Sequence, residues 1–228
     1  MLPLSRRERL ALCDLLARVG PEAPTLCRGW SAYDLAAHLV LRETLPVSSA
    51  GIVVPWLSGL TGRSMRRLQR RHGFTELVDR LRAGPPRWSP LRTPRLDAAA
   101  NTMEFFVHHE DVRRARAGWS PRTLETLDED ALWSVVRRTG RMLLRRSPVG
   151  VELVRTDRTA VVRVQDGEPT LVVRGLPAEL AMFAHGRGAV AQVEYDGDAD
   201  ARAAFAATFT DSPAVGVRET PEEPQTDS

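Results

Sequence analysis

Apolar residues recur at helical spacing through the first two thirds of the chain. Leu12, Leu16 and Val19 follow this spacing, and the pair Gly20-Pro21 ends the pattern. The same pattern predicts five further helices, over residues 32–48, 63–72, 75–83, 98–117 and 128–146. We therefore expect a helical domain over residues 1–147.

Two of these predicted helices have recognisable N-terminal signals. Ser31 is placed to cap the helix over residues 32–48, and Asp34 follows three residues later as an acidic variant of the capping box. Asp97 is placed to cap the helix over residues 98–117, which ends before Gly118.

The pattern changes from helical to alternating after Pro148. Alternation predicts strands over residues 149–154, 159–164, 170–174 and 189–195, with a helix over 177–183 and a final helix from Asp198 through Phe209. The fold class is therefore α+β, with a small α+β domain over residues 148–210. Residues 211–228 are rich in Pro, Glu, Thr and Ser, and this composition predicts a disordered tail.

The composition excludes several chemistries. All 32 cationic side chains are arginine, because the sequence contains no lysine. A Schiff-base lysine, a pyridoxal-phosphate anchor and a Walker-A lysine are thereby ruled out. The net charge of +3 is too small to indicate a nucleic-acid partner.

One basic run stands out between residues 63 and 71. It interleaves Met65 and Leu68 with five arginines, Arg63, Arg66, Arg67, Arg70 and Arg71. We interpret the run as the solvated face of a helix, and a membrane-surface or nucleic-acid patch is the alternative.

Sequence signals for export or membrane insertion are missing. No apolar run approaches the roughly 20 residues that span a bilayer, and the first residues are charged where a signal peptide is apolar. The two cysteines, Cys13 and Cys27, form no CxxC motif. We expect a cytoplasmic protein in a reducing compartment.

The candidate chemistry involves few residues, since the chain has five histidines. His108 follows Glu104 by four positions in a predicted helix, which puts both side chains on one face about 6 Å apart. His38, in the helix over residues 32–48, is the natural third ligand. Two imidazoles and a carboxylate suit zinc or a similar divalent ion, although such spacing also arises by chance and a histidine among apolar neighbours is commonly a core residue.

Three segments carry a resemblance to a known family. Residues 24–39 contain Gly29-Trp30-Ser31 and His38, residues 101–114 contain Glu104 and the run His108-His109-Glu110-Asp111, and residues 175–198 contain Gly175-Leu176-Pro177. The chain resembles the DinB-like superfamily, and more closely its mycothiol-dependent maleylpyruvate isomerase branch. The resemblance covers nearly all of the chain before the tail.

The resemblance implies an up-down helical bundle with a four-helix core, followed by a small α+β domain. It also implies a divalent metal, usually zinc, with His38, Glu104 and His108 as the ligands. An open coordination position would hold the sulfur of mycothiol, the thiol cosubstrate, as a thiolate. The implied enzyme is an isomerase or thiol transferase that acts on a small electrophilic substrate.

Two other classes of function stay open. The first is a non-catalytic metal-binding or regulatory protein that has kept the bundle and lost the reaction. The second is a nucleic-acid or membrane binder that acts through the arginine run. The sequence specifies neither the electrophile nor the oligomeric state.

Four neighbouring residues have weaker candidate roles. Arg42 shares a helix face with His38 and is a candidate for binding an anionic substrate, although an ion-paired arginine is the commoner case. Asp111 is placed either to orient the imidazole of His108 or to pair with Arg114. Asn101 is placed to hydrogen-bond Glu104, and Cys27 is either an adventitious ligand or a small buried side chain.

Overall fold

The structure is a computed structural model that describes residues 2–44, 58–86 and 88–209. The chain divides into two compact units, Met1–Gly140 and Arg141–Ser228. The first unit is helical and the second combines helices with a four-stranded sheet, so the predicted α+β class is confirmed. The predicted tail over residues 211–228 lies outside the described residues.

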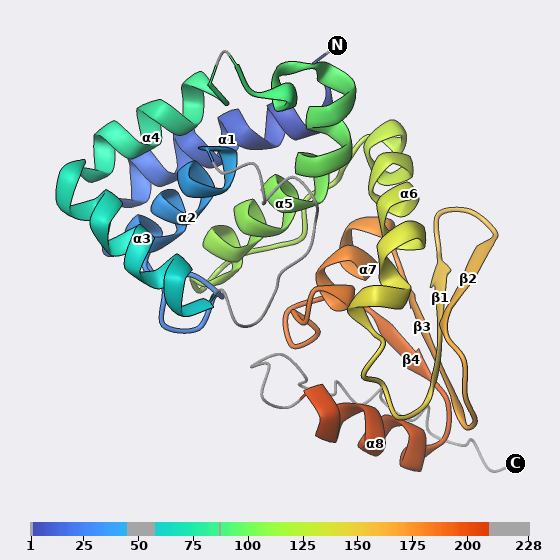
Figure 1. Cartoon of the computed structure of the whole chain (residues 1–228). Coiled ribbons are helices and arrows are strands. Elements are labelled where there is room, and N and C mark those ends of the chain that lie inside the picture. The colour runs from blue at the N-terminus through green and yellow to red at the C-terminus, as the bar shows by residue number, and fades with distance from the viewer. Residues whose placement is uncertain (1, 45–57, 87, 210–228) are drawn as a thin grey trace, which may run out of the picture. The chain divides into compact units, whose positions relative to one another are not determined.

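In the described residues, the first unit contains a bundle of the α-helices α1 to α5 (Figure 1). Residues 115–125 then lead to α6, most of which also belongs to this unit. Helix α1 contacts α4 and α5, and α2 contacts α3 and α4. A short 3-10 turn, η3, precedes α5. The bounds are α1 Leu4–Val19, α2 Ala32–Thr44, α3 Ser58–Arg71, α4 Phe74–Ala83, η3 Pro90–Arg92, α5 Pro94–Arg114 and α6 Thr126–Leu143.

Large apolar side chains from four helices form the core of this bundle. They come from α1, α2, α4 and α5, and all are almost completely shielded from solvent. The members are Leu12, Leu16, Leu35, Leu39, Leu77, Leu81 and Phe105. Their helical spacing is what the sequence pattern predicted, so the apolar stripe of each helix faces the shared core.

The predicted capping box begins α2. The Ser31 backbone N–H donates to Asp34 Oδ2 at 3.0 Å, and the Asp34 backbone N–H donates to Ser31 Oγ at 3.4 Å. Asp34 Oδ1 also accepts a hydrogen bond from Gln69 of α3 at 2.8 Å. The start of α2 is thus fixed, and with it the direction in which His38 projects.

The prediction that Asp97 caps α5 is wrong. Thr93 is the N-cap and Pro94 begins the helix, where its locked φ is compatible with the first turn. Asp97 lies inside the first turn and is buried. Its carboxylate accepts hydrogen bonds from Ser5 Oγ at 2.5 Å and from Arg9 at 3.1 Å, so it binds α1 to α5.

The second unit is a sheet with strand order β2-β1-β3-β4. Strand β1 pairs antiparallel with β2 and parallel with β3, and β4 pairs antiparallel with β3. Helices α7 and α8 both contact β3, and they contact each other through stacked Phe183 and Phe205 rings, 5.4 Å apart. The bounds are β1 Gly150–Arg155, β2 Ala160–Gln165, β3 Thr170–Gly175, α7 Pro177–Ala184, β4 Glu194–Asp196 and α8 Ala199–Phe209.

The predicted strand over residues 189–195 is correct only at its end. Strand β4 covers Glu194–Asp196, and the preceding residues form turns. The backbone N–H of Gln192 donates to Glu179 Oε2 of α7 at 2.8 Å. This N–H is therefore bound by a helix side chain, and pairing with β3 begins at Glu194. The predicted Asp198 cap is confirmed, because its Oδ1 accepts the Ala201 N–H at 2.6 Å.

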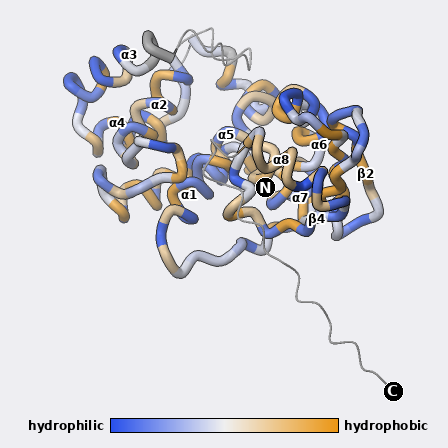
Figure 2. Tube along the Cα trace, turned by 90° about the horizontal axis from the view of Figure 1, so that it is seen from below, coloured by the Kyte–Doolittle hydropathy of each residue, from blue (hydrophilic) through white to orange (hydrophobic). Residues whose placement is uncertain are grey.

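The arginine run lies on α3 with the arrangement of an amphipathic helix. All five arginines are exposed, whereas Met65 is buried and Leu68 packs against the core. Figure 2 shows the hydrophilic colouring along α3. Among the described helices, none is both long and apolar enough to cross a membrane.

The capping box provides a test of how α2 is held. Ser31→Ala removes the side-chain oxygen that accepts the Asp34 N–H, so we expect the free energy of unfolding to fall by about 1 kcal/mol. Denaturant unfolding followed by circular dichroism measures the change. Ser134→Ala, an exposed serine of α6, is the matched control and should stay within about 0.5 kcal/mol of the wild type.

Candidate metal centre

Three side chains from two helices converge at one point in the first unit. His38 extends from α2, and Glu104 and His108 extend from α5, one turn apart. Glu104 Oε1 lies 3.2 Å from His38 Nε2 and 3.3 Å from His108 Nε2. One donor atom from each residue lies within 4.8 Å of the others. The structure therefore brings together the three residues that the sequence singled out, and their role as metal ligands stays a prediction.

The donor set has the chemistry of a divalent-metal site. Two imidazole nitrogens and one carboxylate oxygen are the ligand types that zinc takes in catalytic sites, where three protein ligands leave one position for a small molecule. The side chains of His38 and Glu104 are each 23% exposed and that of His108 is 13% exposed. The residues thus fit a metal ion that is accessible from solvent.

Strong electrostatic coupling links Glu104 and His108. Burial raises the pKa of Glu104, but hydrogen bonds with His108 and His38 outweigh burial and hold this pKa well below its usual value. Burial lowers the pKa of His108, but hydrogen bonds with Asp111, Cys27 and Glu104 outweigh it and raise this pKa well above its usual value. The pair therefore favours a carboxylate beside an imidazolium, in which a proton balances the negative charge.

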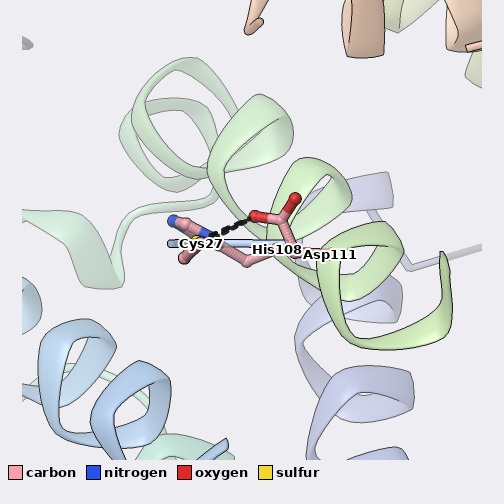
Figure 3. Close-up of side chains that lie close together, drawn as sticks. All are labelled: Cys27, His108 and Asp111. Atoms are coloured by element: carbon pink, nitrogen blue, oxygen red, sulfur yellow. Dashed lines mark hydrogen bonds and ion pairs between the residues drawn. The ribbon is translucent and has the colours of Figure 1, made fainter. Parts of the chain in front are cut away.

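The other nitrogen of His108 is held by Asp111 and Cys27 (Figure 3). His108 Nδ1 lies 2.9 Å from Asp111 Oδ2, and the Cys27 thiol donates to the same oxygen at 3.2 Å. The Asp111 side chain is completely buried. This contact fixes the ring so that Nε2 faces Glu104, which is how carboxylates orient metal-ligating histidines.

Cys27, His108 and Asp111 also satisfy the distance criterion for a metal group, with donor atoms within 4.8 Å of one another. This group uses Nδ1 of the same imidazole, and that nitrogen already forms the hydrogen bond to Asp111. We therefore interpret Cys27 and Asp111 as residues that hold the His108 imidazole in its orientation and not as a second metal site. Sequence reasoning identified Asp111 by its i+3 spacing, but nothing local to Cys27 predicts that it reaches α5.

Arg42 lies beside the three candidate ligands. Its Nε is 3.4 Å from Glu104 Oε1, and its terminal nitrogens donate to Asn101 Oδ1 and, at 2.8 Å, to the Ala100 carbonyl. The guanidinium is therefore anchored to α5 and adds positive charge next to Glu104. Its role in binding an anionic substrate stays a prediction.

The prediction that Asn101 hydrogen-bonds Glu104 is wrong. The Asn101 amide donates to Asp97 Oδ1 at 2.8 Å, and its oxygen accepts from Arg42. Asp97 lies one turn earlier on α5 and accepts the amide N–H, while the amide oxygen faces Arg42. Asn101 instead connects Arg42 to Asp97.

Arg9 and Glu43 extend this polar network into the interior. The Arg9 guanidinium donates to Glu43 and Asp97, and its carbon lies 4.7 Å from the centre of the Phe105 ring. Both Arg9 and Glu43 are buried. Burial raises the pKa of Glu43 to about 7, although the charge of Arg9 opposes the shift.

His109 faces a different part of the bundle from His108. His109 Nδ1 lies 2.8 Å from Glu8 Oε2 of α1, and Arg122 bridges Glu8 and Glu110. The remaining histidines also have other partners: His72 lies 2.8 Å from Glu76, and His185 Nδ1 lies 2.9 Å from the Ala181 carbonyl. Of the five histidines, His38 and His108 therefore meet at the candidate centre.

Comparison with known proteins shows that the fold of this chain is similar to that of a solved structure. No protein-family model matches the sequence, and no curated protein matches it. The chain is similar to the crystal structure of the mycothiol-dependent maleylpyruvate isomerase, with a TM-score of 0.54 over 85% of this chain and 90% of that chain. The two chains share a fold. Their sequences are 17% identical, so the similarity is one of fold.

Glu43 predicts a pH dependence of stability. Its pKa is raised from 4.5 to about 7, so its contribution is fully present below pH 4.5 and is lost as the pH rises through 7. The loss amounts to about 3 kcal/mol at 1.36 kcal/mol per pKa unit. Unfolding free energies of the wild type and Glu43→Gln, measured at pH 5 and pH 8, test this.

We expect the wild type to lose more stability than Glu43→Gln between these two pH values. The glutamine keeps an oxygen for Arg9 and does not ionise. A difference between the two proteins that is the same at pH 5 and pH 8 contradicts the assignment.

Proposed function

We propose that this chain is a divalent-metal-dependent enzyme that uses mycothiol, a low-molecular-weight thiol, to act on a small electrophilic substrate. The observation that carries the proposal is the convergence of His38, Glu104 and His108, with donor atoms within 4.8 Å, in a fold shared with a mycothiol-dependent isomerase. The reaction is an isomerisation or a thiol transfer. The metal is zinc in this proposal, because two imidazoles and one carboxylate are typical zinc ligands.

A zinc ion held by these residues would supply one kind of chemistry: it stabilises the sulfur of a bound thiol as a thiolate at neutral pH. Glu104 provides the negative charge that attracts the cation, and His38 and His108 provide neutral nitrogen donors. Asp111 holds His108 in the orientation that directs Nε2 to the cation. Metal binding therefore requires the release of the His108 proton.

The thiolate is the nucleophile of the proposed reaction. A thiolate held there would supply a nucleophile able to add reversibly to a conjugated double bond, as an isomerisation requires, or to displace a leaving group together with its electron pair, as a transfer requires. Arg42, 3.4 Å from Glu104, provides positive charge for an anionic substrate at this point.

The cellular setting of the proposal follows from its cosubstrate. A low-molecular-weight thiol persists in a reducing compartment, and Cys13 and Cys27 are both thiols and not disulfide-bonded. We therefore place the reaction in the cytoplasm, with a small-molecule thiol and a small electrophile as the partners.

Metal content tests the ligand assignment directly. We expect protein purified without an affinity tag to retain about one zinc ion per chain, as in three-ligand catalytic zinc sites. His38→Ala and Glu104→Ala should lose it after dialysis, whereas His72→Ala, which removes a histidine paired with Glu76, should keep it. Elemental analysis by mass spectrometry gives the stoichiometry. Equal retention by all four proteins would rule out this ligand set.

Calorimetric titration with mycothiol then distinguishes the proposed enzyme from the alternative, a non-catalytic metal-binding protein. The zinc-loaded wild type should bind mycothiol saturably, and the zinc-free protein should not. Zinc retained at full stoichiometry without any mycothiol binding would favour the non-catalytic alternative.

Asp111 and Cys27 provide a test of the support behind His108. Asp111→Asn removes the negative charge that fixes the imidazole, so we expect zinc affinity to fall roughly 10- to 100-fold. Cys27→Ser keeps a donor for Asp111 and should stay close to the wild type. Competition with a chromogenic chelator measures both affinities. Unchanged affinity in Asp111→Asn would show that the imidazole is oriented without this carboxylate.

A further inference from the structure

A second candidate site lies at the other end of α5. A cavity of about 120 Å³ is lined by residues of α1, α4 and α5 and of the segments before α5. Asp97, which lines it, precedes Glu104 by seven positions, or about 10 Å along a helix axis. Among the described residues, its charged lining consists of that one carboxylate and four arginines, Arg6, Arg9, Arg82 and Arg92.

A buried donor belongs to this lining. The Arg9 side chain is 7% exposed, and its Nη2 donates to Glu43 and Asp97. Its Nε is buried and has no hydrogen-bond partner within the described part of the chain. A buried donor without a partner is destabilising, and more so when the group is charged, because it has lost its hydrogen bonds to water. An acceptor bound in the cavity would offset that cost.

Positive charge exceeds negative charge around the cavity. Arg82 is paired with Asp14 at 2.7 Å. Arg6 and Arg92 are exposed, and with the described residues neither side chain forms an ion pair or hydrogen bond. Two guanidinium groups at the cavity are therefore available to a ligand from solvent.

We propose that this cavity binds a small tetrahedral oxyanion of the phosphate type, separately from the metal centre. Guanidinium groups match phosphate oxygens with paired N–H donors, and here they come from separate segments, as a tetrahedral acceptor requires. The volume corresponds to about four water molecules at roughly 30 Å³ each, which is enough for a phosphate group.

The test uses inorganic phosphate as the probe and calorimetry as the readout. Because phosphate also binds zinc, the titrations use chelator-treated protein at constant ionic strength, with His38→Ala as a second background. We expect saturable binding at one site per chain in both proteins. Failure of the metal assignment leaves this result unchanged, so the two proposals are tested independently.

Paired double variants locate the binding. Arg6→Gln with Arg92→Gln removes the two available guanidinium groups, and we expect affinity to fall at least about 10-fold, as for lost charge-assisted hydrogen bonds. Arg18→Gln with Arg116→Gln makes the same charge change at two exposed arginines outside the cavity lining and should change affinity less than about twofold. Thermal unfolding verifies that both double variants fold.

Two further probes distinguish the sources of the oxyanion. Glycerol phosphate that binds more tightly than inorganic phosphate supports a phosphorylated metabolite as the ligand, and the reverse order supports free phosphate. Acetate that binds as tightly as phosphate would overturn the tetrahedral assignment. Absence of saturable phosphate binding in the wild type, or equal loss in both double variants, would overturn the site.

Discussion

Helix α5 buries charged and polar side chains along most of its length, and each of them needs a partner that the interior must supply. Asp97 receives hydrogen bonds from Ser5 and Arg9, and Glu110 receives them from Arg114 and Arg122. Because these partners come from α1, from α5 itself and from the segment after it, satisfying them fixes how the first helix and the chain after α5 lie on α5. The candidate metal centre is one section of this continuous polar surface.

The local parts of this arrangement follow from the sequence. Apolar periodicity predicts the helices because each has one core-facing stripe, and Ser31 with Asp34 predicts the start of α2 because the capping box is formed within four residues. The i,i+4 spacing is sufficient to place Glu104 and His108 on one face. His38 is the natural third ligand because it lies among apolar residues of another predicted helix, and the family resemblance implies the same residue, although no local rule brings α2 to this part of α5.

The predictions failed where a residue is hydrogen-bonded to a partner outside its own segment of the sequence. Asp97 reads as a cap, but Ser5 and Arg9, about ninety residues away, determine its role. Gln192 reads as part of a strand, but Glu179 takes its N–H. Partner choices of this kind depend on the assembled fold, and the identities of neighbouring residues do not encode them.

The absence of lysine has a structural counterpart in the helical unit. Arg9, Arg114 and Arg122 each lie over an aromatic ring, at 4.7, 4.6 and 5.4 Å, and each also binds a carboxylate. A planar guanidinium can stack and donate in its plane at once, whereas an ammonium is a hydrated point charge. The interior of this bundle uses a property that lysine lacks.

The imidazole of His108 bears on how the proposed site would take up a metal ion. With Nδ1 against Asp111 and Nε2 facing Glu104, the ring lies between two carboxylates, and Arg42 adds a second positive charge beside Glu104. In the folded chain these two carboxylates therefore have positive partners, His108 and Arg42, at the candidate centre. If the proposed site takes up a metal ion, uptake would exchange the His108 proton for that ion, so it would depend on both the pH and the free metal concentration.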